Sequence, residues 1–259
     1  MKHLKYRKYW IPIATGLAAY AAALLALAPA TLIDARLQHT GEGTLRLAEA
    51  RGSVWSGAGW LEVRDAHGRA GIARRLAWRA LPESLLRGRL VAEVELEQAA
   101  RPFPVTMSLS GMQVGAARIR LPAAALGLGM PRLAPLRLTG EVEVDIAHLL
   151  LRRGRMDIAA TLQWRSAGSA LTPVAPLGDY EVRFTADGPA LHAVLSTLEG
   201  PLRLEGKGTW SASAPPDFLA TARVPAEHQD QLSPLLRLIA VERGAGSFEI
   251  SSANAAFGS

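Results

Sequence analysis

Side chains of alternating polarity dominate this sequence from about residue 40 onward, and this pattern constrains the fold more than any other feature. Val91 to Glu97 alternates apolar residues with carboxylates, and Leu136 to Ile146 does the same, with Gly140 as a turn or bulge. Successive side chains of a β-strand point to opposite faces, so both segments predict half-buried strands. Shorter segments predict further strands at Thr44 to Leu47, Met156 to Trp164, Tyr180 to Thr185, Leu202 to Leu204 and Phe248 to Ser251.

Turn residues separate these segments at intervals that suit β-hairpins. They occur at Asp65 to Gly68, Arg152 to Gly154, Asp187 to Pro189 and Gly206 to Gly208. Strands with one apolar face that are joined by short turns form antiparallel meanders covered on one side. We therefore predict a mainly β fold with an antiparallel sheet, either curved and open or closed into a sandwich.

Few segments have the spacing of a helix. Pro82 to Leu86 predicts one turn, and Gln229 to Val241 predicts the best short helix, with its apolar residues on one side. Pro189 to Leu198 fits a strand or a helix. Pro122 to Pro135 predicts a connector, and a sub-boundary near 122–135, between two sheet regions, and Ser211 to Pro216 predicts a small loop.

The N-terminal region has the composition of a membrane anchor. Residues 1–9 form a basic tail that includes Lys2, Lys5, Arg7 and Lys8, and no acidic residue precedes Asp34. The apolar segment that begins at Trp10 would span about 30 Å as a helix, which matches the hydrocarbon core of a bilayer. Because basic flanks stay in the cytoplasm, we predict a transmembrane helix at 10–33, with Trp10 at the interface, and an exported domain at 34–259.

A cleaved secretory signal is the alternative interpretation of the same segment. Small residues flank possible cleavage sites at Ala26-Leu27-Ala28 and at Ala28-Pro29-Ala30. The apolar run is longer than a signal core of roughly 7–15 residues, which favours a retained anchor. The chain contains no cysteine, so a lipid-modified N-terminus and disulfide bonds are excluded.

The high isoelectric point does not indicate nucleic-acid binding. Four of the 29 Lys and Arg residues lie in the basic tail, which leaves 25 basic residues against 23 acidic ones in the remainder of the chain. The Arg residues are scattered and aromatic residues are sparse, whereas nucleic-acid binding requires a basic stripe or stacking platforms. We therefore expect no nucleic-acid partner.

Residue patterns that carry catalysis or bind metals are missing from the sequence. The six histidines are far apart, and no Gly-x-Ser-x-Gly motif occurs. The segment Gly200 to Gly208 departs from a phosphate-binding loop in its spacing and lacks Ser or Thr after Lys207. Glu93, Glu95 and Glu97 share one solvated strand face, which would not separate their pKa values for acid–base catalysis. We expect no enzyme activity, no cofactor and no metal.

Two groups of motifs resemble the N component of bacterial type II secretion systems. The first group runs from Gly52-Ser53-Val54-Trp55-Ser56-Gly57 through Leu76-Ala77-Trp78 to Leu85-Leu86-Arg87-Gly88-Arg89-Leu90. The second runs from Pro176-Leu177-Gly178-Asp179-Tyr180 through Leu198-Glu199-Gly200-Pro201-Leu202-Arg203-Leu204-Glu205-Gly206 to Gly208-Thr209-Trp210. The resemblance implies a bitopic protein of the bacterial inner membrane with a periplasmic β-rich domain. It also implies partners among the other secretion components in the inner membrane and periplasm, and no catalytic residues.

Structural roles are expected for most of these motif residues. We expect Trp55, Trp78 and Trp210 to fill the core, with an interaction surface as the alternative. We expect turns or bulges without room for a side chain at Gly57, Gly178, Gly200 and Gly206. Asp179 is expected to cap a turn, with a binding role as the alternative. Gly52, Tyr180 and Leu202 complete the motif residues.

Three functional hypotheses follow. The first is a structural subunit of the secretion machinery, whose sheet binds partners by strand addition at a free edge. The second is a lipid-handling β-groove tethered to the inner membrane, and the third, an envelope enzyme, has no positive support. The first two differ in whether a second layer covers the apolar strand faces, represented by Val91, Val94, Leu96, Leu138, Val142 and Val144.

Overall fold

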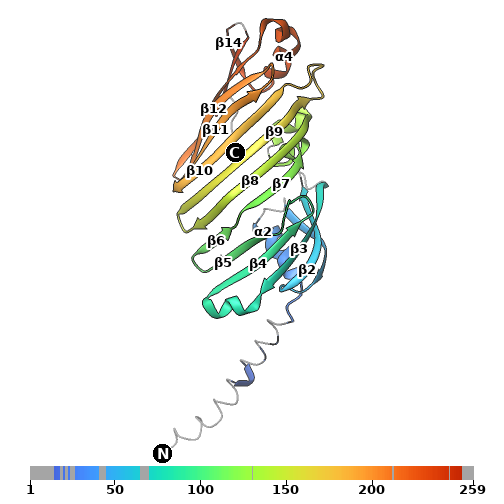
Figure 1. The fold of residues 1–259 in the computed structure, drawn as a ribbon, viewed down its shortest axis with the longest axis vertical. Helices are drawn as coiled ribbons and strands as arrows, with labels where there is room; N and C mark the ends of the chain where they lie inside the picture. The colour runs from blue at the N-terminus through green and yellow to red at the C-terminus, as the bar shows by residue number, and fades with distance from the viewer. Residues whose placement is uncertain are drawn as a thin grey trace, which may run out of the picture.

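Fifteen β-strands form one antiparallel sheet in the part of the chain that the structure describes (Figure 1). The structure is a computed structural model, and it describes residues 15–17, 20, 23, 27–40, 45–64, 70–129, 131–211, 213–244 and 246–252. The strand order is β1-β2-β3-β4-β5-β6-β8-β9-β10-β11-β12-β13-β15-β14, and β7 also pairs with β8. The predicted antiparallel β fold is confirmed, and the sheet is open because β1 and β14 are not neighbours.

The strands follow one another as hairpins along most of the sheet. The N-proximal strands are β1 (Leu45–Gly52), β2 (Ser56–Arg64), β3 (Ala70–Leu81), β4 (Arg89–Leu96), β5 (Phe103–Ser108) and β6 (Gly111–Val114). The C-proximal strands are β7 (Ala117–Pro122), β8 (Leu138–Arg152), β9 (Arg155–Ser169), β10 (Gly178–Gly188), β11 (Ala190–Glu199), β12 (Arg203–Ser211), β13 (Ala214–Arg223), β14 (Val241–Gly244) and β15 (Ser247–Ser251). The short strands β6 and β7 pair with successive parts of the long strand β8, so the sheet is continuous between its two halves.

Short helices precede β1 or lie between the strands, and the described residues contain more of them than the two that the sequence predicts. They are α2 (Thr31–Thr40), η1 (Pro82–Arg87), η2 (Ala123–Ala125), α3 (Leu126–Gly129), η3 (Pro131–Leu136), η4 (Ala226–His228) and α4 (Gln229–Leu236). The segment 122–135 contains three of these helices and connects β7 to β8, which pair with each other. The single turn predicted at Pro82 to Leu86 is confirmed as η1.

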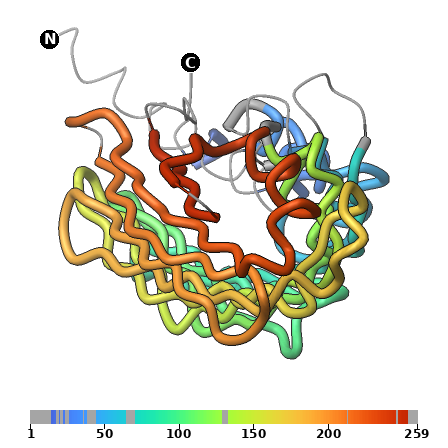
Figure 2. Tube along the Cα trace, turned by 90° about the horizontal axis from the view of Figure 1, so that it is seen from above, coloured from blue at the N-terminus to red at the C-terminus, as the bar shows by residue number. Residues whose placement is uncertain are grey.

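The sheet is bent into a trough, and the helices α2 and α4 lie on its concave side (Figure 2). The alternation of the sequence explains this layering, because the apolar face must be buried against something. Below α4 a buried cluster joins Leu232 and Leu236 to Val142, Leu202 and Phe248. Below α2 a smaller cluster contains Ala30, Leu47 and Trp78. We call these the α4 core and the α2 core.

Bulges shift the register at several predicted positions. Gly140 lies at a bulge between Thr139 and Glu141, as expected, and its φ of 103° is one that L-residues rarely adopt. A Cβ atom at this position would also lie 2.5 Å from the carbonyl oxygen of Ser166 on β9. The bulge therefore requires glycine.

Several expectations about local structure were wrong. Gly206 and Gly208 lie inside β12 and pair with Leu195 and Ala193 of β11, so they form no turn. Most of the loop predicted at Ser211 to Pro216 is β-strand. Val91 was expected on the same face as Val94 and Leu96. The register of β4 instead places it on the opposite face, which carries Glu93.

Two helix predictions are resolved by tertiary contacts. The segment Pro189 to Leu198, which fitted a strand or a helix, is strand β11. The helix predicted at Gln229 to Val241 ends at Leu236, and Val241 begins β14. Pairing with β15 explains the early end, because the chain must turn back to reach the sheet edge.

The predicted anchor falls mainly on residues that the structure does not describe. Lys2, Lys5, Arg7, Lys8 and Trp10 lie outside the described residues. Within the described residues, none of the helices combines the length and the apolar character that crossing a membrane requires. The helix α2 runs from Thr31 to Thr40, across the expected boundary at residue 33.

Candidate functional site: sheet faces and sheet edges

The inner, concave face of the sheet is apolar along its length. Across the two central strands, Val142, Val144 and Ile146 of β8 pair with Trp164, Leu162 and Ala160 of β9. These inner positions continue toward both ends of the sheet as Val94, Val105 and Val114 on one side and Phe184, Leu195 and Phe218 on the other. At these positions the sheet therefore presents apolar residues to the side where the helices lie.

Cover over this face is uneven. Leu138 and Val142 are buried beneath the second layer in the α4 core, and Val144 packs against that core. Val94 and Leu96 are half-buried and belong to neither core. Between the two cores, Met107 is 44% exposed, and Met112 and Leu151 are half-buried. The residues that should distinguish a scaffold from a lipid groove therefore give a divided result. A second layer covers one part of the inner face, and the middle of that face is incompletely covered.

One cation lies at an inner position of β3, the third strand from the β1 edge. Arg74 of β3 pairs with Leu61 of β2, whose side chain lies on the inner face. Its side chain is half-buried and donates from Nη1 to the carbonyl oxygen of Ala73, 2.9 Å away. A half-buried guanidinium beside apolar side chains is suited to an anionic group.

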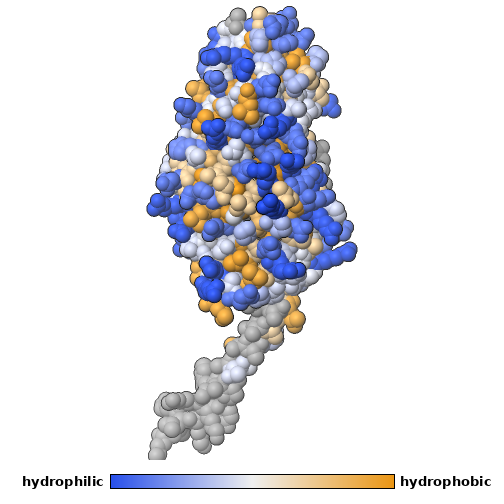
Figure 3. Space-filling model, in the orientation of Figure 1, coloured by the Kyte–Doolittle hydropathy of each residue, from blue (hydrophilic) through white to orange (hydrophobic). Residues whose placement is uncertain are grey.

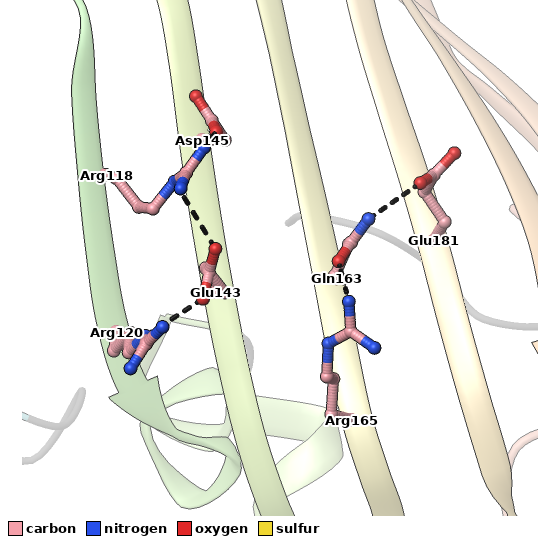
Figure 4. A network of polar contacts seen from close by, with 7 residues as sticks. All are labelled: Arg118, Arg120, Glu143, Asp145, Gln163, Arg165 and Glu181. Atoms are coloured by element: carbon pink, nitrogen blue, oxygen red, sulfur yellow. Dashed lines mark hydrogen bonds and ion pairs between the residues drawn. The ribbon is translucent and has the colours of Figure 1, made fainter.

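The outer, convex face carries the charges. Arg118 of β7 donates to Asp145 of β8 over 2.9 Å from Nε, and Arg120 donates to Glu143 over 2.9 Å (Figure 4). The hydrogen bond that Arg118 donates to Asp145 raises the pKa of Arg118 further above its usual value, so the guanidinium stays charged. Figure 3 shows hydrophilic residues spread over this face among hydrophobic ones.

The same polar network continues across β9 and β10. Gln163 donates to Glu181 over 3.0 Å, Arg165 donates to Gln163 over 2.6 Å, and Arg183 donates to Glu181 over 2.7 Å. A depression of about 420 Å³ lies over these strands, and its lining includes Arg118, Glu143, Asp145, Gln163, Glu181 and Arg183. Each arginine here donates hydrogen bonds to a carboxylate or an amide, so the network stabilises the pairing of neighbouring strands. Among the described residues, no group of three or more His, Asp or Glu side chains could hold a metal ion.

The first group of motif residues comes together at the α2 core. Trp78 is buried, and its Nε1 donates to the carbonyl oxygen of Ser53, 3.2 Å away. Its ring lies over Gly57, where a Cβ atom would be 2.5 Å from Cζ2. Gly52 adopts a φ of 94° at the end of β1, and Trp55 is half-buried in the turn that follows.

The second group meets where β9, β10 and the β11–β12 connection converge. The hydroxyl of Tyr180 donates to the carbonyl oxygen of Leu202 over 3.0 Å, and burial raises the pKa of Tyr180. Asp179 Oδ1 accepts the backbone N–H of Ser166 over 2.7 Å, at a bulge where Ser166 has a φ of 47°. Gly200 lies against Gly178, whose backbone leaves no room for a Cβ atom. Gly206 and Trp210 lie further along β12, outside this contact.

The two edges of the sheet differ in a way that the sequence did not reveal. At the β1 edge, the N–H of Leu47 donates to Asp34 Oδ1 over 2.8 Å, and the carbonyl oxygen of Gly52 accepts from Ala30 over 3.1 Å. A bridge between Pro29 and Ser53 extends this cover. Residues 28–34 therefore occupy hydrogen-bonding groups of the β1 edge.

The β14 edge is open among the described residues. All four residues of β14 are exposed, and the strand pairs with β15 alone. Arg243 and Glu242 form ion pairs with Glu249 and Arg237, which hold the strand to its neighbours. An exposed edge of this kind presents free backbone groups to an incoming strand.

Comparison with known proteins gives one match. The family model for type II secretion system (T2SS), protein N, matches residues 43–251. The match begins two residues before β1 and ends at the last residue of β15, so it covers the whole sheet. No curated protein and no solved structure matches the chain.

Proposed function

The chain belongs to the type II secretion system protein N family, and from this premise we propose that it is a non-catalytic accessory component of the inner membrane whose sheet binds other secretion components. Family membership confirms the resemblance carried by the sequence motifs and makes the chain a type II secretion component. In this proposal the part of the predicted 10–33 segment that precedes Ala28 anchors the chain in the inner membrane with the basic tail in the cytoplasm, because residues 28–34 lie against the β1 edge. The sheet then lies in the periplasm and supports the export of folded proteins across the outer membrane.

The open edge at β14 is the observation that carries the binding role. The β1 edge is occupied by residues 28–34, whereas β14 has one strand neighbour among the described residues. An extended segment of a partner protein would pair with β14 as an additional strand, and its main-chain hydrogen bonds would supply affinity. Figure 1 places β14 at the end of the sheet opposite to β2 and α2, so in this proposal the partner would dock away from the membrane.

Site-specific crosslinking in intact cell envelopes tests this role. A photoreactive amino acid at Val241 or Arg243 should crosslink to another secretion component. The same group at Arg46, an exposed residue of the covered β1 edge, is the matched control and should crosslink at least fivefold less. Equal crosslinking at both edges, or recovery of intact secretion complexes without this chain, would contradict the proposal.

A lipid-binding groove is the second candidate, and the incomplete cover over the middle of the inner face favours it. Met107, Met112 and Leu151 lie between the two cores, where an acyl chain could pack on apolar side chains. Arg74 lies on β3, on the β1 side of these residues, and would contact the anionic headgroup of a lipid that extends along the inner face to this strand.

Photoreactive acyl chains test the second candidate. With the full chain in bilayers, the crosslinks should map to residues 105–114 and 149–158, which carry the inner residues of the middle strands. Arg74→Gln should reduce crosslinking by anionic lipids more than by neutral ones. Crosslinks confined to the outer face, or none at all, would remove this candidate.

A further inference from the structure

The turn between β3 and β4 exposes leucines. Leu86 of η1 is 92% exposed, and Leu81 and Leu85 beside it are exposed as well. Scattered single leucines on a surface are ordinary, but three within six residues form a local apolar patch. We call Leu81, Leu85 and Leu86 the η1 patch.

Hydrogen bonds fix the shape of this turn. Ser84 is buried, donates from Oγ to the carbonyl oxygen of Leu81 over 2.5 Å, and accepts the N–H of Val91 over 3.0 Å. Gly88 ends the turn with a φ of 69°, and its N–H donates to the carbonyl oxygen of Leu85 over 2.9 Å. The leucines are therefore held outward by a turn that is tied to β4.

The η1 patch lies at the end of the molecule where the N-terminal residues join the sheet. Val54 donates its N–H to the carbonyl oxygen of Ala28 over 3.0 Å, and Ala80 donates to that of Trp55 over 2.6 Å. Two hydrogen-bonded contacts thus connect Ala28 to the strand that leads directly into η1. Figure 1 shows the teal turn between β3 and β4 at the lower end, with Thr15–Leu17 beyond it. Figure 3 shows hydrophobic residues gathered at the same end.

Cations accompany the apolar patch. Arg87 and Arg89 are exposed, and neither forms an ion pair with another described residue, whereas Glu83 is the one acidic residue of η1. Apolar side chains next to unpaired cations are the combination that binds the interface of an anionic bilayer.

We propose that the η1 patch lies in the headgroup region of the bilayer and that Arg87 and Arg89 contact its anionic phosphates. This inference rests on the membrane anchor of the proposed function, because an anchor that enters the sheet at Ala28 brings this end of the molecule to the bilayer surface. A second contact beside the anchor restricts the tilt of the sheet. It thereby directs the β14 edge away from the membrane.

Depth-dependent fluorescence quenching tests the contact in the full chain. The chain contains no cysteine, so Leu86→Cys carries a single fluorophore. In vesicles of phosphatidylethanolamine and phosphatidylglycerol with a spin label near the headgroup, we expect at least threefold stronger quenching than at Leu238→Cys. Leu238 is the matched control, because it is 61% exposed and follows α4 at the opposite end. Both positions are exposed, so neither label disturbs a core.

Three outcomes separate the inference from the proposed function. Equal quenching at both positions in a chain that floats with the vesicles overturns the contact and leaves the anchor intact. A chain that does not float with the vesicles overturns both. In the Leu86→Cys background, Arg87→Ser with Arg89→Ser should reduce quenching at least twofold in vesicles with phosphatidylglycerol and leave it unchanged with phosphatidylcholine alone. Unchanged quenching in the anionic vesicles would overturn the phosphate contact.

Discussion

At the scale of single residues, glycines allow tryptophan rings to lie flat on the inner face of the sheet. Trp78 covers Gly57 in the α2 core, and Trp210 covers Gly208 on β12, where a Cβ atom would lie 2.6 Å from Cζ3. A large ring next to a residue without a side chain fills the same volume as two medium side chains. Glycine within a strand often marks this kind of close packing.

Gly57→Ala should therefore destabilise the chain. The added Cβ atom would clash with the carbonyl oxygen of Arg51 and with Cζ2 of Trp78, and such overpacking costs about 1–3 kcal/mol of unfolding free energy. Urea denaturation monitored by tryptophan fluorescence measures this loss. Gly244→Ala in β14 is the matched control, because no atom lies within 4 Å of its added Cβ, and it should stay within about 0.5 kcal/mol of the unaltered chain. Equal losses at both positions would contradict the close packing of Gly57 against Arg51 and Trp78.

The buried hydroxyl of Tyr180 should make the stability of the chain decrease at alkaline pH. Burial raises its pKa in the folded state, so the folded chain keeps a proton that the unfolded chain releases above about pH 10. Its contribution to stability is fully present below pH 10 and is lost as the pH rises further, by about 1.4 kcal/mol per pH unit.

Tyr180→Phe isolates this effect from the titration of other groups. The variant loses the hydrogen bond to Leu202, so at pH 8 it should be less stable by about 1 kcal/mol. Since phenylalanine does not ionise, the difference between the two chains should shrink and then reverse above pH 10. Denaturation curves at pH 8, 10 and 11 measure this difference, and a constant value would show that Tyr180 titrates normally.

At the scale of elements, strands were predictable where alternation is regular, and their ends were not. The alternation in Val91 to Glu97 and Leu136 to Ile146 located β4 and β8, because the buried face of a strand requires an apolar residue at every second position. Because glycine favours turns locally, Gly206 and Gly208 predict a turn, and this prediction was wrong. The neighbouring Ala220 and Trp210, which require glycine inside the strand, approach only in the folded sheet.

The sequence predicts the candidate site less completely than it predicts the fold. The free edge was expected in general terms, but no local pattern in Val241 to Gly244 indicates that this strand lies at an edge. Edge position depends on which strands pair, and β14 reaches the edge because the chain reverses after α4. The cover of β1 by Asp34 and Ala30 is also a contact between distant segments.

The helix α4 should be essential to the C-proximal half of the sheet. Leu232 has no exposed surface and contacts the cluster that contains Val142 and Phe248. Leu232→Ala removes about 2–5 kcal/mol of unfolding free energy, because the cavity is enclosed by strands that cannot close over it. Leu238→Ala, a substitution at an exposed leucine just after the helix, should change it by less than about 0.5 kcal/mol. Thermal denaturation distinguishes the two variants. A loss of unfolding free energy at Leu232 as small as that at Leu238 would show that the packing of α4 contributes little to stability.

At the scale of the whole molecule, one sheet carries two separate cores. The α2 core lies on β1–β3 and the α4 core lies on β8–β15, and the strands β4, β5 and β6 connect the two parts. Stability in extended assemblies of this kind is transmitted between neighbouring strands, so a defect in one core reaches the other only through the connecting strands. The two parts should consequently open independently.

Hydrogen exchange in variants of each core tests this independence. Leu232→Ala should increase amide exchange at least tenfold in residues 138–251 and less than twofold in residues 45–96. Gly57→Ala should produce the reverse pattern. Among the strands, the backbone amide protons of β5 and β6 should exchange fastest in the unaltered chain, because the inner side chains of these strands belong to neither core. A uniform increase along the sheet in either variant would mean that the fifteen strands unfold as one cooperative unit, and that β5 and β6 couple the cores tightly despite their incomplete cover.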